Sequence, residues 1–86
     1  MSDSSFPTSA QLLAAVVSAV KAAGGKASNQ QIQEIVIKDL RLTPDQVTAI
    51  HSGNRTELEY RLAWARTNAK KKGLIASAGP RTWVIP

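Results

Sequence analysis

Apolar residues recur at helical spacing in several segments of the chain, and short polar or glycine-containing breaks separate these segments. The first segment runs from Thr8 or Ser9 to Ala23, with one apolar stripe formed by Leu12, Leu13, Val16, Val17 and Val20. This spacing predicts an amphipathic helix. A hydroxyl at Thr8 or Ser9 suits its N-terminal cap, and Gly24 and Gly25 end it because glycine adopts the left-handed conformation at little cost.

Two shorter helices follow, and each is indicated by a hydroxyl residue with a glutamine three positions later. Ser28 with Gln31 predicts a helix from about Asn29 to Leu40, with inward-facing Ile32, Ile35, Val36 and Leu40. Thr43 with Gln46, and Pro44 at the first helical position, predict a helix from Pro44 to about Ile50, with Val47 and Ile50 in the core. The segment Lys26–Ser28 is too short to be more than a strand stub, and "HSGN" at 51–54 predicts a turn.

The last third of the chain predicts one long helix and a hairpin. Thr56 with Glu59 starts a helix that continues to Lys72, where Gly73 ends it. The runs "LIAS" (74–77) and "TWVI" (82–85) favour strands, and "AGPR" between them predicts a loop longer than a two-residue turn. We therefore expect an α+β winged helix-turn-helix domain over residues 8–86, with three to four helices and a C-terminal β-hairpin wing, after a flexible tail at 1–7.

The long helix has two distinct faces at 3.6 residues per turn. The core face holds Leu58, Leu62, Ala65 and Ala69, and the outward face holds Tyr60, Ala63, Trp64, Thr67, Lys70 and Lys71. The outward face is small or aromatic in its middle and cationic at its C-terminal end. Aromatics at i and i+4 most often pack against a neighbouring element. Alternatively, Tyr60 and Trp64 form an apolar platform that touches methyl groups in a DNA major groove.

Charge is distributed unevenly along the chain. Residues 1–50 hold four basic and four acidic groups, whereas residues 51–86 hold seven basic and two acidic groups, so the net +5 belongs to the last 36 residues. Such asymmetry is the footprint expected of a nucleic-acid binder, and it equally suits a solvated surface. The lysines at 70–72 favour the negative end of the helix dipole, and they can also neutralise phosphates.

Composition argues against several other classes of protein. The chain has no cysteine and one histidine, His51, which excludes disulfides and thiolate or histidine-rich metal sites and fits a reducing, cytoplasmic setting. His51 itself is expected at the surface. The sequence contains no membrane-span candidate, no glycine-rich phosphate loop and no nucleophile–base arrangement. We therefore expect neither an enzyme nor a cofactor or membrane partner.

The candidate contacts to DNA come from four segments. Ser28 and Asn29 lie at a helix N-terminus, where they suit a phosphate contact or simple capping. Arg81 lies in the expected wing, where it suits the minor groove or backbone, or is an ordinary loop arginine. The full set is Ser28, Asn29, Asn54, Arg55, Tyr60, Ala63, Trp64, Arg66, Thr67, Lys70, Lys71 and Arg81. Trp83 alternates with Ile85 on one strand face and is expected in the core or supporting the wing.

Residues 24–85 resemble the N-terminal domain of Mrr-type restriction proteins. The resemblance lies in "GGKASNQQIQEIVIKDLRLT", "RLAWARTNAKKKGLI" and "RTWVI", which together cover most of the chain. It implies a winged helix that binds double-stranded DNA, with a preference for modified bases, and that precedes a nuclease domain in whole proteins. No nuclease domain follows Pro86 here, so the chain is expected to be a fragment or a freestanding reader, working with a nuclease domain or partner chain.

Two other functions fit the same residues. A protein-interaction winged helix would use the Tyr60 and Trp64 face as an apolar patch, and its binding would depend weakly on salt. A scaffold or oligomerisation domain would use the valine-rich first helix. The positive charge confined to residues 51–86 favours DNA over both alternatives, because cationic contacts to phosphates release counterions and make binding strongly salt-dependent.

Overall fold

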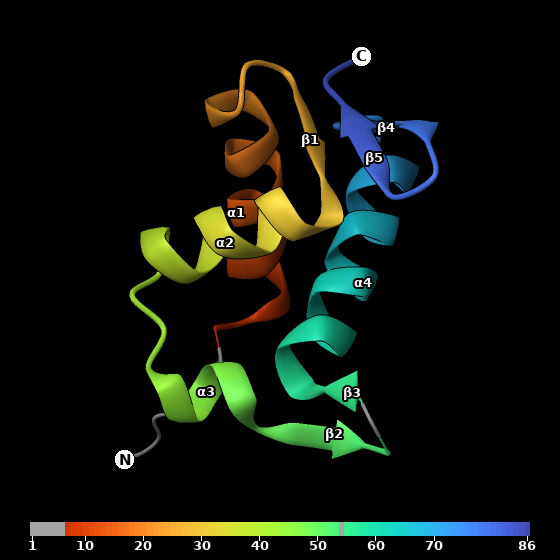
Figure 1. Cartoon of the computed structure of the whole chain (residues 1–86). Helices are drawn as coiled ribbons and strands as arrows, with labels where there is room; N and C mark the ends of the chain where they lie inside the picture. The colour runs from red at the N-terminus through yellow and green to blue at the C-terminus, as the bar shows by residue number, and fades with distance from the viewer. Residues whose placement is uncertain (1–6, 54) are drawn as a thin grey trace.

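A computed structural model describes residues 7–53 and 55–86, and for residues 50–52 and 55 it describes the backbone alone. The elements in chain order are α1 (Ser9–Ala22), β1 (Lys26–Ser28), α2 (Asn29–Asp39), α3 (Pro44–Thr48), β2 (Ile50–Ser52), β3 (Arg55–Thr56), α4 (Glu57–Lys71), β4 (Ala76–Gly79) and β5 (Thr82–Val84). The α+β class, with helices followed by a C-terminal hairpin, is confirmed, and the arrangement is that of a winged helix (Figure 1). Of the expected tail, residues 1–6 lie outside the described part.

Every helix in this part of the chain begins at a capping box. The four caps are Thr8, Ser28, Thr43 and Thr56, so Thr8 rather than Ser9 caps α1. In each box the cap hydroxyl accepts from the amide three residues later at 3.1–3.2 Å, and that residue's side chain accepts from the cap amide at 2.7–3.0 Å. Each such cap contributes about 1 kcal/mol. Each helix therefore begins where an N-cap residue and the residue three positions later exchange hydrogen bonds.

The three longer helices end in the same way. The backbone N–H two residues past each C-cap donates to the carbonyl five residues earlier, at 2.9–3.0 Å. The residue between the C-cap and this N–H has a positive φ. That residue is Gly24 in α1 and Gly73 in α4, as the sequence predicts. In α2 it is Arg41, with φ +52, a conformation that favours glycine. Arg41 is thus a strained residue at an otherwise ordinary helix end.

The core lies between α1, α2 and α4. α1 packs against both α2 and α4, and α3 packs against α4 at the opposite end from the sheet (Figure 1). The fully buried side chains include Leu12, Val16 and Val20 of α1, Ile32 and Val36 of α2, and Leu58 and Leu62 of α4. Ala65 and Ala69 are also buried, so the predicted core face of the long helix is confirmed.

The sheet has three strands in the order β1-β5-β4, all antiparallel to their neighbours. β1 is therefore more than the stub predicted, because Ala27 pairs with Trp83 and joins the hairpin to the start of α2. Trp83 and Ile85 pack against the core, as their alternation predicts. In the pairing of β1 with β5, Ser28 lies opposite Thr82, so the wing begins beside the first turn of α2.

The hairpin differs from its prediction in strand position and loop length. Leu74 and Ile75 precede β4, while Gly79, expected in the loop, pairs with Thr82. The connection is therefore the two residues Pro80 and Arg81, and the expected longer loop is wrong. The pairing shifts between Ser77 and Gly79, and this irregularity lets a glycine-containing segment with weak strand propensity continue as a strand.

The segment between α3 and α4 is also more regular than predicted. α3 ends at Thr48 instead of near Ile50, and residues 50–52 pair with 55–56 as a second, two-stranded sheet. The turn predicted at 51–54 therefore begins too early, since its first two residues belong to β2. Glu57 donates its amide to the carbonyl of Ala49 at 2.7 Å, which closes this ladder against the start of α4. The side chain of His51 lies outside the described residues.

Candidate nucleic-acid interface

The outward face of α4 carries an exposed aromatic side chain in its middle. Trp64 is 53% exposed, so it is a surface residue and not part of the core. Together with Tyr60, Ala63 and Thr67 it lines a shallow, mainly apolar depression on this face. The hydroxyl of Thr67 donates to the carbonyl of Ala63 at 3.0 Å, which leaves its methyl group on the surface. The structure thus brings together four of the residues predicted from the sequence.

A smaller hollow of about 190 Å³ lies on the other side of these aromatics, against the start of α1. Tyr60 and Trp64 share it with Ser9, Leu12 and Asn68. Both aromatics therefore face the start of α1 across this hollow, while Trp64 remains largely open to solvent. Beside them, Arg61 pairs with Glu57 at 2.5 Å across one helical turn, so this flank of α4 is charge-balanced.

The C-terminal end of α4 is cationic. Lys70, Lys71 and Lys72 are exposed, and the first two lie in the last helical turn. Their positions there stabilise the helix through its dipole by a few tenths of a kcal/mol to about 1 kcal/mol each. They also continue the Tyr60–Thr67 face toward the sheet. The outward face therefore changes along its length from aromatic to cationic.

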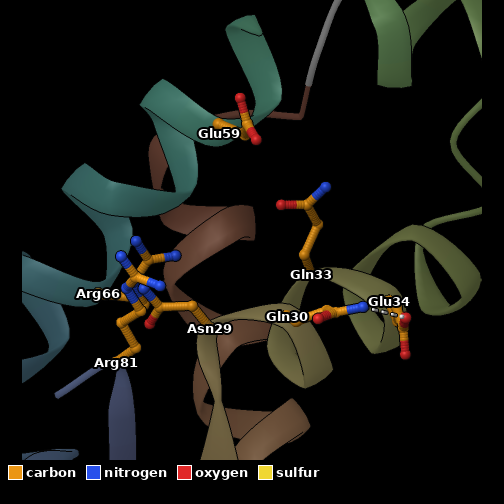
Figure 2. Close-up of a pocket in the computed structure, with 7 residues that line it drawn as sticks. All are labelled: Asn29, Gln30, Gln33, Glu34, Glu59, Arg66 and Arg81. Atoms are coloured by element: carbon orange, nitrogen blue, oxygen red, sulfur yellow. Dashed lines mark hydrogen bonds between the residues drawn. The ribbon is translucent and has the colours of Figure 1, made fainter. Parts of the chain in front are cut away.

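A polar cleft of about 740 Å³ lies on the remaining flank of α4, between it and α2. Its lining residues are Asn29, Gln30, Gln33, Glu34, Glu59, Arg66 and Arg81. Figure 2 shows Asn29, Arg66 and Arg81 converging at one end from three elements, with Glu34 and Glu59 away from them. Glu59 and Arg66 lie nearly two turns apart on α4, which separates them by roughly 10 Å. The cleft is therefore polarised, with a cationic end beside the wing.

Asn29 is tied to the wing by two hydrogen bonds. The indole Nε1–H of Trp83 donates to Asn29 Oδ1 at 2.7 Å, across 54 residues of sequence. The backbone N–H of Asn29 donates to the carbonyl of Arg81 at 2.9 Å. These bonds hold the start of α2 against β5 and the turn that precedes it. They also place Asn29 and Arg81 at the same end of the cleft.

Arg81 adopts a conformation that arginine rarely takes. Its φ is +56, and it follows Pro80 in the two-residue connection between β4 and β5. Proline followed by a residue with positive φ is typical of a type II turn, where glycine or asparagine is preferred at the second position. An arginine there costs about 1–2 kcal/mol. The side chain is exposed and reaches the cleft (Figure 2).

The remaining predicted site residues are placed as follows. The hydroxyl of Ser28 accepts from the Gln31 amide in the capping box, so capping is its observed role. Asn54 and the side chain of Arg55 lie outside the described residues. Gln33 and Glu34 line the cleft but were not predicted as site residues. They follow Asn29 by four and five residues on the same helix, and this spacing of polar residues is the sequence pattern that could have indicated them.

In the described part of the chain, no helix is long and apolar enough to cross a membrane. Residues 7–53 and 55–86 also contain no group of three or more histidine, cysteine or carboxylate side chains placed to hold a metal ion.

Comparison with known proteins identifies one family. The family described as the Mrr N-terminal domain matches residues 10–86. This range includes all four described helices except the first residue of α1, and all the strands. No curated protein and no solved structure gave a significant match to the chain. The resemblance predicted from the sequence is therefore confirmed at the level of the family.

Proposed function

Because this chain belongs to the Mrr N-terminal domain family, which associates it with Mrr-type restriction systems, we propose that it binds double-stranded DNA as their recognition module. α4 enters the major groove, and the β4–β5 turn follows the adjacent backbone. Cleavage then belongs to a nuclease domain or partner chain, and the domain itself is not catalytic. The expected setting is the cytoplasm, where such a system meets incoming DNA.

The observation that carries this proposal is the composition of the outward face of α4. A helix that enters the major groove needs small or flat side chains in its middle and cations where it meets phosphates. Ala63, Thr67 and the exposed ring of Trp64 supply the first, and Lys70 and Lys71 supply the second. The helix is presented by an element order and sheet typical of winged helices, with the wing beside its C-terminal half.

The apolar depression favours contacts to methyl groups. The thymine methyl, or a methyl added to adenine or cytosine, projects into the major groove and is recognised by apolar contact. Tyr60, Ala63, Trp64 and Thr67 present such a surface, and the hydroxyl of Thr67 is engaged with its own helix. We therefore propose that Trp64 discriminates between methylated and unmodified duplexes.

A protein partner is the second candidate, and the exposure of Trp64 is the observation that favours it. Exposed tryptophans are enriched at the energetic centres of protein interfaces. A partner helix packed on Tyr60 and Trp64 would bury this apolar patch, and its affinity would change little with salt. DNA binding is the stronger proposal, because the same face ends in Lys70 and Lys71. Contacts of these lysines with phosphates would make the affinity fall as the salt concentration rises.

The deciding experiment is a fluorescence-anisotropy titration with three matched duplexes: unmodified, adenine-methylated and cytosine-methylated, each at two salt concentrations. DNA binding predicts affinity that falls steeply with salt, and methyl recognition predicts a preference for one methylated duplex. Equal, salt-sensitive binding would reject methyl recognition and keep DNA binding. An absence of binding to all three duplexes at low salt would reject the DNA proposal and turn the search to a protein partner.

A further inference from the structure

We propose that the cationic end of the α2–α4 cleft holds one phosphodiester of the DNA backbone, and that Trp83 aims the Asn29 amide at it. The proposal rests on the DNA-binding function above and goes beyond it, because it assigns a phosphate site off the outward face of α4 and a positioning role to a residue of β5. Three elements distant in sequence build this site: α2, α4 and the β4–β5 turn.

The chemistry of the Trp83 contact determines which way the Asn29 amide faces. An indole N–H is a donor only, so its partner in the 2.7 Å bond has to be the carbonyl oxygen of the Asn29 side chain. The NH₂ group therefore occupies the other branch of the amide and presents donors alone. Asn29 also lines the cleft, and Figure 2 shows its side chain extending toward Arg66 and Arg81. Trp83 thus makes Asn29 a donor toward the ligand space.

The two arginines complete a set of groups that suits a phosphodiester. Arg66 comes from α4 and Arg81 from the turn, and both guanidinium groups reach the same end of the cleft as Asn29 (Figure 2). Planar guanidinium groups match the paired oxygens of a phosphate, and an amide adds a neutral donor. The carboxylates of the cleft lie away from this end (Figure 2): Glu59 accepts from the Thr56 amide at 3.0 Å, and Glu34 accepts from Gln30 at 3.4 Å.

The position of the site is that of a phosphate bordering the groove. Arg66 lies on the flank of α4 next to Ala63 and Thr67, so a duplex that seats the outward face in its groove brings one backbone strand toward α2. Arg81 sits opposite, at the turn of the wing, and its carbonyl accepts from the backbone N–H of Asn29. The strained φ of Arg81 is explained if the side chain contacts the ligand, since glycine would fit the turn better.

The test uses Asn29→Asp. Aspartate retains the oxygen that accepts from Trp83, removes the NH₂ donors and adds a negative charge. The first turn of α2 has no acidic residue, so aspartate there suits the helix dipole and the melting temperature should stay equal or rise. We expect affinity for the duplex to fall by about tenfold or more, because a charge-assisted donor is lost and a repelling group is gained. Unchanged affinity would overturn the site.

Two further variants separate positioning from folding and charge. Trp83→Phe removes the indole donor and leaves the aromatic ring, so affinity should fall several-fold while the salt slope stays unchanged. The same change made in the Asn29→Asp background should cause no further loss, since Trp83 acts through the Asn29 donors alone. Equal losses in both backgrounds would reject positioning. Arg81→Gln should make the slope of log affinity against log salt shallower by about 1.

The control is Lys38→Gln, which removes one exposed positive charge from the far end of α2 and should leave the slope within a few tenths of the original. The unmodified protein is measured first at low salt. If it does not bind DNA, the proposed function fails. If it binds, and Asn29→Asp and Arg81→Gln bind equally well with the same salt slope, the phosphate site is wrong and the DNA-binding function stands.

Discussion

The two sides of α4 that face solvent are built in different ways. The outward face is made by one helix, from residues three or four apart, and its central feature is the exposed Trp64. The cleft is made by α2, α4 and the β4–β5 turn, and its cationic end includes Asn29, which Trp83 bonds across 54 residues. The middle of the outward face is apolar and local in sequence, whereas the cleft is polar and assembled by tertiary contacts.

This difference assigns different tasks to the two surfaces. Apolar contact distinguishes bases by their methyl groups, whereas arginine and amide donors bind phosphates of any sequence. We therefore expect changes at the aromatic middle of the outward face to alter discrimination between duplexes, and changes in the cleft or at Lys70 and Lys71 to alter affinity and its salt dependence. Variants of each surface separate these two effects, and a variant of the core removes both surfaces together.

Leu62→Ala should destabilise the whole domain. Leu62 is fully buried on the core face of α4, and truncating a buried leucine leaves a cavity that costs about 2–5 kcal/mol. That is a large fraction of the total stability of a domain this size, about 4–13 kcal/mol. Urea denaturation followed by circular dichroism measures the loss, and DNA binding should fall in parallel. A loss below about 1 kcal/mol would contradict the packing of α4 described here.

Reversal of both Lys70 and Lys71 to glutamate should abolish DNA binding without unfolding the domain. The net charge falls from +5 to +1, and two phosphate contacts become repulsions, so affinity should drop by about 100-fold or more. The matched control reverses Lys21 and Lys38, which are exposed and also lie in the last turns of their helices. It causes the same change in net charge and a similar dipole cost. Equal losses in both double variants would show that net charge, and not the end of α4, governs binding.

Trp64→Ala should remove discrimination between methylated and unmodified duplexes while leaving the fold intact. The side chain is 53% exposed, so the free energy of unfolding should change by less than about 1 kcal/mol. The salt slope should not change, because no charge is removed. Leu74→Ala is the control, since Leu74 is another exposed large apolar residue and lies beyond the end of α4. Retained discrimination in Trp64→Ala would end the methyl-reader proposal.

Arg81→Gly should have the smallest effect on the fold. It should raise the stability of the domain while lowering its affinity for DNA. Glycine relieves the left-handed strain at φ +56, so stability should rise by a few tenths of a kcal/mol to about 1 kcal/mol, partly offset by the greater freedom of glycine in the unfolded chain. The loss of the guanidinium should weaken DNA binding and make the salt slope shallower by about 1.

Arg41→Gly provides the matched comparison for that change. Arg41 has nearly the same φ, +52, but lies past the C-terminal end of α2, away from the cleft. Thermal melts should show a similar gain in stability for both variants, while anisotropy should show weakened binding for Arg81→Gly alone. If the salt slope changes equally in both variants, the loss of any arginine charge has this effect, and Arg81 has no special role in the cleft.

Local patterns in the sequence were sufficient for the helices and for one of the two surfaces. The capping boxes at Ser28, Thr43 and Thr56 and the glycine ends at Gly24 and Gly73 were all predicted, as was the outward face of α4. The strands were predicted less well. Gly79 and Pro80 favour a loop, but pairing with β5 outweighs the low propensity of Gly79 and shortens the connection to two residues.

The sequence by itself determined where each helix begins, which side of it is buried, and the family to which the chain belongs. The helix starts and buried sides depend on hydrogen bonds between residues three to five apart and on a periodic apolar stripe, so residues close together in the sequence encode them. Only the tertiary structure decided the cleft: that Asn29 accepts from Trp83, that Arg81 faces Arg66, and that β1 joins the hairpin. These depend on which helices pack together, because side chains on distant segments meet only after the core has brought their backbones side by side.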